Sequence, residues 1–346
     1  MSVSLARQQS RYRMRTVLFS VSAVLVVVAG AGAWWAYSTF WQPPHERTTL
    51  RGNEGAVRAL AYAPDGKVLA SGGDDRFVRL WDPVAGTLRH TLEGHESSVM
   101  ALAFSTDGKT LASGSLEGTI KLWDPETGKE TASKLGQKGG GVWSLAFSSD
   151  GKMLASGGKD GSVKVWNIDL DGEPKTLQAG FPIASVAFTP DSKSLAGGGG
   201  NNLNVIIWDV DTLKERGNIS EGAYGSIHAL AFSPNGQLLA RGTSTSKVKV
   251  VNAETTKEER IFTGHTGNVF CVAFSPDSKL LASSGPDGKV KLWDLEKGTE
   301  RATLPDNRSG VNAVAFSPDG KTVTSASGDF FHTGDVKLWD VPDKER

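Results

Sequence analysis

Short apolar runs separated by turn residues dominate this chain, and residues 269–294 show the pattern most clearly. Three runs, 269–274, 279–283 and 289–293, are rich in valine, leucine, phenylalanine or alanine. The segments between them, 275–278 and 286–288, consist of serine, proline, aspartate and glycine. These residues favour tight turns because they fix φ, adopt positive φ or bond to nearby backbone groups. The stretch therefore predicts three antiparallel strands joined by short connections.

The same unit recurs along most of the chain. A fourth apolar run, such as 87–93 or 258–263, follows the third run of a unit. The third runs end at Trp81, Trp123, Trp166, Trp208, Val251, Trp293 and Trp339, with gaps of 42, 43, 42, 43, 42 and 46 residues. Four strands repeated at this period are typical of the blades of a β-propeller. The pattern predicts an all-β, seven-bladed β-propeller at residues 46–346.

The two ends of the repeat region are incomplete in a complementary way. Residues 46–51 align with 88–93, the outermost strand of the first complete unit. Only six residues follow Trp339-Asp340, which is too few for a fourth strand. We therefore expect strand 46–51 to complete the last blade and close the ring, which removes two open sheet edges.

The repeated motifs resemble those of the WD-repeat proteins. The resemblance rests on Gly264-His265, Ser275-Pro276-Asp277, Asp287-Gly288 and Trp293-Asp294, which recur with variations over about residues 46–346. It implies a seven-bladed propeller and a structural hydrogen-bonded tetrad formed by His265, Ser283, Asp287 and Trp293. It says little about function, because function depends on the sites that a fold carries.

The tetrad contains serine, histidine and aspartate, so a nucleophilic triad is the alternative interpretation. Parts of the same set recur in other units, at Ser71, Asp75 and Trp81 and at Ser156, Asp160 and Trp166. A catalytic site would not be copied around a ring, so we expect a structural role and no catalytic residue. The fifth unit has Arg241, Thr245 and Val251 at the positions of serine, aspartate and tryptophan. We expect its blade to be among the least stable, unless a partner or a neighbouring blade covers it.

The N-terminal part of the chain has a different composition. Residues 1–15 form a basic tail with four arginines and no acid, and residues 16–44 carry no charged side chain. The apolar stretch 17–40 would span about 36 Å as a helix, enough to cross a bilayer. We expect a transmembrane helix (signal anchor) at residues 16–41, followed by a linker at 42–45. A cleaved signal peptide is the alternative, because Ala31-Gly32-Ala33 fits a cleavage site.

The arginines before this stretch predict the orientation of the chain. Positive residues flanking a membrane span favour the cytoplasmic side. We therefore expect a single-pass membrane protein with a cytoplasmic N-terminus and an extracytoplasmic propeller, either periplasmic or extracellular.

Charge and cysteine content argue against several classes of function. The 38 basic residues balance 38 acidic ones, and no basic stripe suits a nucleic acid. The single cysteine, Cys271, rules out an internal disulfide framework, and the six histidines show no zinc-ligand spacing. We therefore expect no nucleic-acid partner, no metal and no cofactor.

Candidate binding residues lie at variable positions that the family pattern assigns to the top face. The second residue of each inner strand is expected near the mouth of the central channel, and aromatic and arginine side chains are enriched in interface hot spots. Packing between blades is the alternative for Trp143 and Phe270. The expected protein-binding residues are Arg58, Met100, Trp143, Phe181, Tyr224, His228, Phe270, Phe330 and Phe331.

These features together predict a membrane-anchored scaffold or accessory subunit that binds a protein or peptide at its top face, and not an enzyme. One alternative is a subunit of a larger membrane complex held by its helix. Another is a secreted or periplasmic ligand-binding or enzymatic propeller, which would need acids or metal ligands at the channel mouth.

Overall fold

The structure is a computed structural model that describes residues 45–137, 139–200, 203–220, 225–304, 309–329 and 332–342. Residues Glu46–Val341 form one compact unit. The transmembrane helix expected at residues 16–41 lies outside the described residues. Within the described ranges, no helix has the length and apolar character needed to cross a membrane.

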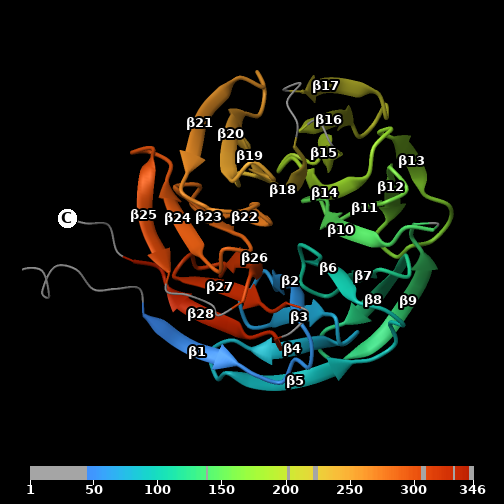
Figure 1. Cartoon of the computed structure of the whole chain (residues 1–346). Coiled ribbons are helices and arrows are strands. Elements are labelled where there is room, and N and C mark those ends of the chain that lie inside the picture. The colour runs from blue at the N-terminus through green and yellow to red at the C-terminus, as the bar shows by residue number, and fades with distance from the viewer. Residues whose placement is uncertain are drawn as a thin grey trace, which may run out of the picture. The chain divides into compact units, whose positions relative to one another are not determined.

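Seven four-stranded antiparallel sheets are arranged around a central axis (Figure 1). Each sheet is one blade, as the seven-fold repeat predicted, and the all-β seven-bladed propeller is confirmed. In the first six blades the four strands follow one another in the sequence, because each pair is joined by a short turn.

The strands occupy four positions from the axis outward. The innermost strands are β2 (Val57–Tyr62), β6 (Val99–Phe104), β10 (Val142–Phe147), β14 (Ile183–Phe188), β18 (Ile227–Phe232), β22 (Cys271–Phe274) and β26 (Val311–Phe316). The second strands are β3 (Leu69–Gly73), β7 (Leu111–Ser115), β11 (Met153–Gly158), β15 (Ser194–Gly199), β19 (Leu238–Thr243), β23 (Leu280–Ser284) and β27 (Thr322–Ser327).

The third strands are β4 (Val78–Asp82), β8 (Thr119–Asp124), β12 (Ser162–Asn167), β16 (Asn204–Asp209), β20 (Lys247–Asn252), β24 (Val290–Asp294) and β28 (Val336–Asp340). The outermost strands are β5 (Thr87–Leu92), β9 (Lys129–Leu135), β13 (Lys175–Gln178), β17 (Glu215–Ile219), β21 (Glu258–Thr263), β25 (Thr299–Leu304) and β1 (Glu46–Leu50). We call the face that carries the connections from outermost to innermost strands the top face.

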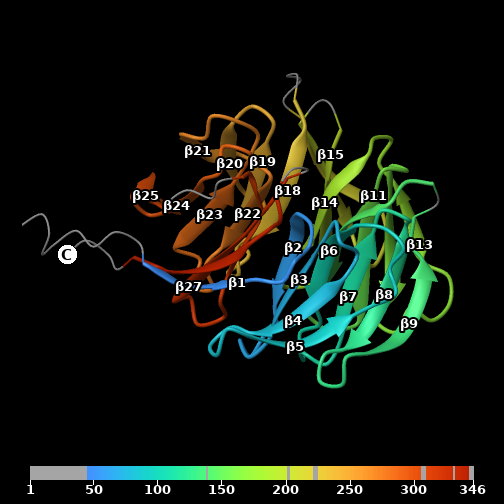
Figure 2. The same cartoon turned by 60° about the horizontal axis from the view of Figure 1, so that its bottom comes forward.

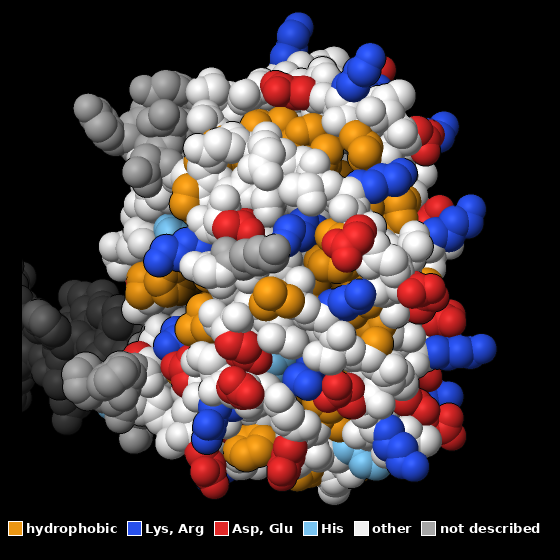
Figure 3. All heavy atoms as spheres, turned by 90° about the vertical axis from the view of Figure 1, so that its right-hand side faces the viewer, with side chains coloured by type: hydrophobic (Ala, Val, Ile, Leu, Met, Phe, Trp, Pro, Cys, Tyr) orange, Lys and Arg blue, Asp and Glu red, His pale blue; other side chains and the backbone are white. Residues whose placement is uncertain are grey.

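Burial follows these positions and explains the composition of the strands. All five residues of β3, β7 and β23 are buried, because the second strand is covered by neighbouring blades on both faces. Most residues of β5 and β9 are exposed. On the side of the ring that includes β9 and β13, lysine and arginine side chains are interspersed with aspartate and glutamate (Figure 3). Mixed charge of this kind discourages pairing of exposed edges with other chains.

The N-terminal strand β1 completes the blade formed by β26, β27 and β28. Its Leu50 is paired with Val336 and its Glu46 with Trp339, and both Figure 1 and Figure 2 show β1 beside the C-terminal strands. Strand β1 ends at Leu50, one residue short of the predicted strand. Lys337 Nζ lies 3.4 Å from Glu46 Oε2, which repeats the lysine–glutamate pairs within other blades.

The fifth blade replaces the missing tryptophan by other packing. Val251 and Arg241 are both 1% exposed, and Phe262 of the outer strand β21 is buried. The ring of Phe262 stacks on Trp293 of the next blade, with centroids 5.0 Å apart and planes 23° from parallel. An aromatic contact of this kind adds about 0.5–1.5 kcal/mol to area burial, so the neighbouring blade supports this one.

Candidate functional site

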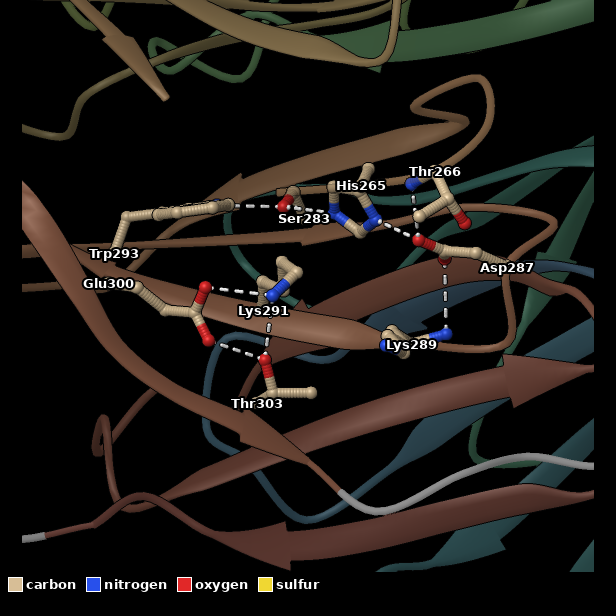
Figure 4. Close-up of polar contacts among 9 residues, drawn as sticks. All are labelled: His265, Thr266, Ser283, Asp287, Lys289, Lys291, Trp293, Glu300 and Thr303. Carbon is tan, nitrogen blue, oxygen red and sulfur yellow. Dashed lines mark hydrogen bonds and ion pairs between the residues drawn. The ribbon is translucent and has the colours of Figure 1, made fainter. Parts of the chain in front are cut away.

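A chain of hydrogen bonds crosses the sixth blade from its top loop to its core (Figure 4). Asp287 lies in the turn before β24, and its Oδ2 accepts the Nδ1–H of His265 at 2.9 Å. The other nitrogen, Nε2, lies 2.8 Å from Ser283 Oγ. Trp293 Nε1 donates to the same Oγ at 2.8 Å. Because the indole supplies one proton to Oγ, the serine hydroxyl can donate its own to a neutral imidazole.

Burial and hydrogen bonding determine the protonation states of His265 and Asp287. Desolvation lowers the pKa of His265 below its usual value, against the raising effect of Asp287. Burial alone would raise the pKa of Asp287, but hydrogen bonds from His265 and from the Thr266 backbone lower it. Ser283 is 0% exposed and no substrate can reach its hydroxyl. The arrangement therefore ties strands together and has no route to nucleophilic catalysis.

Other blades build the same link from different side chains. In the second blade, His95 bonds to Ser113 at 2.7 Å and to Glu117 at 2.8 Å, so glutamate takes the place of aspartate. In the first blade, Asp75 accepts Arg79 Nη1 at 2.5 Å, and both side chains are less than 10% exposed. The roles of Glu117 and Arg79 were not predicted. An acid six residues before Trp123, as before Trp81, Trp166 and Trp293, was a visible signal for Glu117, whereas nothing in the pattern marked Arg79.

The third blade contains a further substitution that the sequence pattern does not reveal. Gln137, which is 0% exposed, occupies the place of the histidine. Its Nε2 lies 3.4 Å from Ser156 Oγ, and Trp166 Nε1 donates to that oxygen at 2.9 Å. The indole anchor is therefore kept without an imidazole.

The side chains expected at the channel mouth are all partly exposed to solvent. The second residue of every inner sequence run is partly exposed, at Arg58, Met100, Trp143, Ala184, His228, Phe270 and Asn312. Their neighbours one position earlier are buried, because those side chains point between blades. This one position of the repeat therefore presents variable side chains at the upper end of the inner strands.

The polar members of this set are held by the protein itself. Arg58 donates to Asp74 through Nε at 3.0 Å and Nη2 at 2.6 Å, a bidentate pair with each side chain about a third exposed. Asn312 Nδ2 donates to the carbonyl oxygens of Val57 at 3.0 Å and Gly328 at 2.9 Å. The charge of Arg58 is thereby balanced, and both side chains are fixed before any partner arrives.

His228 and Phe270 come from neighbouring blades and meet edge to face, with ring centroids 5.6 Å apart. Burial lowers the pKa of His228, so the imidazole is neutral at neutral pH. Phe270 thus packs between blades while remaining partly exposed. The mouth therefore combines this pair with the partly exposed side chains of Met100 and Trp143, and it carries no net charge.

The remaining expected residues divide into two groups. Phe181, in the connection between β13 and β14, packs against Gly200 and lines a shallow depression of about 230 Å³ with Lys159, Asp160, Gly161, Gln178, Gly180 and Pro182. Tyr224, Phe330 and Phe331 lie outside the described residues. In the part of the chain that the structure describes, no three histidine, cysteine, aspartate or glutamate side chains are placed to hold a metal ion.

Short segments of the chain are similar to curated proteins of fungi. A segment of 44 residues is 48% identical to "Ribosome biogenesis protein ERB1" of Chaetomium thermophilum and covers 13% of this chain and 6% of that protein. The corresponding protein of Botryotinia fuckeliana matches to the same extent. That of Neosartorya fischeri is 51% identical over 39 residues, which are 11% of this chain and 5% of that protein. The matched segments thus span a small part of these relatives.

Family models cover most of the propeller. Residues 44–221, just over half of the chain, match the model described as "IFT122 first beta-propeller". Residues 256–294 and 298–340 match "WD domain, G-beta repeat", and residues 206–274 match "Anaphase-promoting complex subunit 4 WD40 domain". Together these matches extend over all seven blades. The chain belongs to the WD-repeat β-propeller family.

Proposed function

We propose that this protein is a binding scaffold that presents the upper mouth of its propeller to a protein or peptide partner. The observation that carries the proposal is the contrast between the two kinds of side chain at the mouth. Arg58 and Asn312 are occupied by internal hydrogen bonds, whereas Met100 and Trp143 are partly exposed. A partner would cover apolar surface there without having to desolvate an unpaired charge.

The rigidity of the mouth also supports binding over catalysis. Binding is weakened by the cost of ordering side chains, about 0.5–1.5 kcal/mol for each long side chain that becomes fixed. The Arg58–Asp74 pair is ordered in advance, and WD-repeat propellers are typically scaffolds without enzymatic activity. A hydrolytic alternative finds no support in the tetrad, because Ser283 is fully buried.

The test compares partner capture by the full chain and by variants with altered apolar surface. Met100→Ala combined with Trp143→Ala removes mouth surface, and Val84→Ala removes an apolar side chain that is 92% exposed in the turn between β4 and β5, at the opposite face. Truncating a central tryptophan costs about 2 kcal/mol or more at a hot spot, or roughly 30-fold in affinity. The mouth variant should lose its captured proteins while Val84→Ala keeps them. Equal capture by both variants, with unchanged melting, would reject the mouth as the binding site.

The membrane tether remains part of the proposal on the basis of composition. Residues 16–44 lack charged side chains and follow a basic segment, which favours a span with a cytoplasmic N-terminus. Protease treatment of intact cells or spheroplasts tests this orientation, with a cytoplasmic protein as the control for lysis. Digestion of the propeller is expected, and a propeller that is cut only after lysis would place it in the cytoplasm. Detergent purification then distinguishes a solitary scaffold from a subunit of a larger complex.

A further inference from the structure

A shallow depression between the third and fourth blades contains the carboxylate of Asp160, one oxygen of which can accept a further hydrogen bond. It is formed by the turn between β11 and β12, which carries Lys159 and Asp160, by Gln178 at the end of β13, and by the β13–β14 connection, which carries Phe181 and Pro182. A Cβ at Gly180 in this wall would meet nothing within 4 Å. The depression is therefore open to solvent, and its volume of about 230 Å³ suits one long side chain.

Asp160 occupies the repeat position whose carboxylate has a cationic or imidazole partner in other blades. Asp75 accepts Arg79 at 2.5 Å, and Asp287 accepts His265 at 2.9 Å. Asp160 Oδ1 accepts the backbone N–H of Ser162 at 3.0 Å and its hydroxyl at 2.8 Å. Within the described ranges, no hydrogen bond or ion pair involves the second oxygen, Oδ2.

Two side chains of the third blade, Gln137 and Lys164, occupy positions from which they could donate to Asp160 Oδ2, but both bond to other groups. Gln137, at the histidine position, bonds to Ser156, and its Oε1 lies 2.9 Å from Ser162 Oγ, so it shares the single Ser162 hydroxyl proton with Asp160 Oδ1. Lys164, at the position of Arg79, donates instead to the carbonyl oxygen of Gly136 at 2.5 Å. The described part of this blade therefore provides the acid of the motif without its base.

The first blade shows which base fits this acid. There the guanidinium of Arg79 bonds to Asp75, and its Cζ lies 5.3 Å from the centroid of the Phe77 ring. The depression is lined by the same two residue types, with Asp160 as the acid and Phe181 as the aromatic residue. A guanidinium combines a planar face for stacking with donors for a carboxylate, and an ammonium lacks the planar face.

We propose that this depression binds an arginine side chain of the partner peptide. The guanidinium donates to Asp160 Oδ2 and stacks against Phe181, and the Gln178 side-chain carbonyl is available as a further acceptor. The proposal rests on the proposed function, because it specifies one anchor on the face where the partner binds. The positive charge of Lys159, which also lines the depression, repels a bound cation. Removing Lys159 should therefore strengthen arginine binding, whereas removing the charge of Asp160 should weaken it.

Saturation-transfer NMR on the full chain in mild detergent tests this assignment. The probes are blocked pentapeptides with arginine, citrulline or glutamate between glycines; citrulline keeps the shape of arginine and lacks its charge. We expect saturation of the arginine side-chain protons to exceed that of citrulline about threefold or more, as an ion pair that is partly exposed allows. Asp160→Asn should abolish the difference and Lys159→Ala should enlarge it.

Matched variants keep the result interpretable. Asp160→Asn retains an Oδ1 acceptor for Ser162, so the turn should keep its structure, and an unchanged melting curve verifies this. Asp211→Asn removes an exposed carboxylate from the turn between β16 and β17, at the opposite face, and should leave the arginine signal intact.

Three results would overturn the proposal. These are equal signals from arginine and citrulline, an arginine preference that survives Asp160→Asn, and a glutamate preference that Lys159→Ala removes. The outcome is separable from that of the mouth variants. Loss of partners in Met100→Ala with Trp143→Ala, combined with no arginine preference, rejects the arginine site and leaves the scaffold function standing.

Discussion

Ring closure by β1 makes Leu50→Ala a sensitive test of how the propeller is held together. Leu50 is 1% exposed and packs in a cluster with Val57, Trp81 and Leu338, residues of the first and last blades. A buried methylene contributes about 0.8 kcal/mol, so loss of the three carbons beyond Cβ costs about 2.4 kcal/mol in transfer free energy. The remaining cavity raises the expected loss to about 3–5 kcal/mol.

Urea unfolding of the full chain, followed by tryptophan fluorescence, measures this loss. Leu88→Ala is the surface control, because Leu88 is 48% exposed on β5, and it should change the free energy of unfolding by about 0.5 kcal/mol or less. Leu92→Ala is the buried control, since Leu92 is 2% exposed at the end of the same strand. If Leu50→Ala matched Leu88→Ala while Leu92→Ala was strongly destabilised, β1 would not contribute to the stability of the ring.

Three further predictions concern the tetrad and the closing strand. Trp293→Phe keeps the aromatic packing and loses the indole hydrogen bond, so the free energy of unfolding should fall by about 0.5–1.5 kcal/mol in urea, and no change would deny the bond a stabilising role. Desolvation lowers the pKa of His95 and His265 below 6.5, so the unfolded chain binds more protons just below that value. Stability measured by urea at a series of pH values should therefore fall as pH decreases through about 6.5. Replacing both histidines by glutamine should reduce this slope to the part contributed by His228, whose pKa is also lowered by burial, and an undiminished slope would assign it to other groups. Lys337→Gln removes the partly exposed pair with Glu46 and should cost about 0.2–1 kcal/mol, with a smaller loss at high salt; a loss that is independent of salt would contradict an ionic origin.

The sequence predicts the blades because each strand and turn is specified locally. In the turn at residues 275–278, Ser275 Oγ donates to Asp277 at 2.6 Å and accepts the N–H of Leu280 at 2.9 Å. Ser278 adopts a φ of 59°, in the left-handed region that turns require. All these groups lie within six residues, so the sequence alone contains the signal. The 42-residue spacing then repeats it around the ring.

Contacts between distant segments were harder to predict. Arg58 was expected to bind a partner, and its bidentate pair with Asp74, sixteen residues away, was not predicted. Gln137 was not recognised as a tetrad member, because glutamine differs from histidine in shape and its role depends on where Ser156 and Ser162 lie. Such contacts follow from the register of neighbouring strands and from side-chain conformations, which periodicity does not specify.

Repetition makes departures from the pattern informative, since each blade supplies the same backbone setting. In the first blade, Arg79 replaces histidine as the partner of the acid, and in the fifth, Phe262 supports the core where tryptophan is missing. Both departures are compensated within the chain. In the third blade, the described residues leave Asp160 Oδ2 without a base, and this carboxylate lies on the face where partly exposed mouth side chains gather. Because the described residues provide no basic partner for this carboxylate, we expect another molecule to provide one.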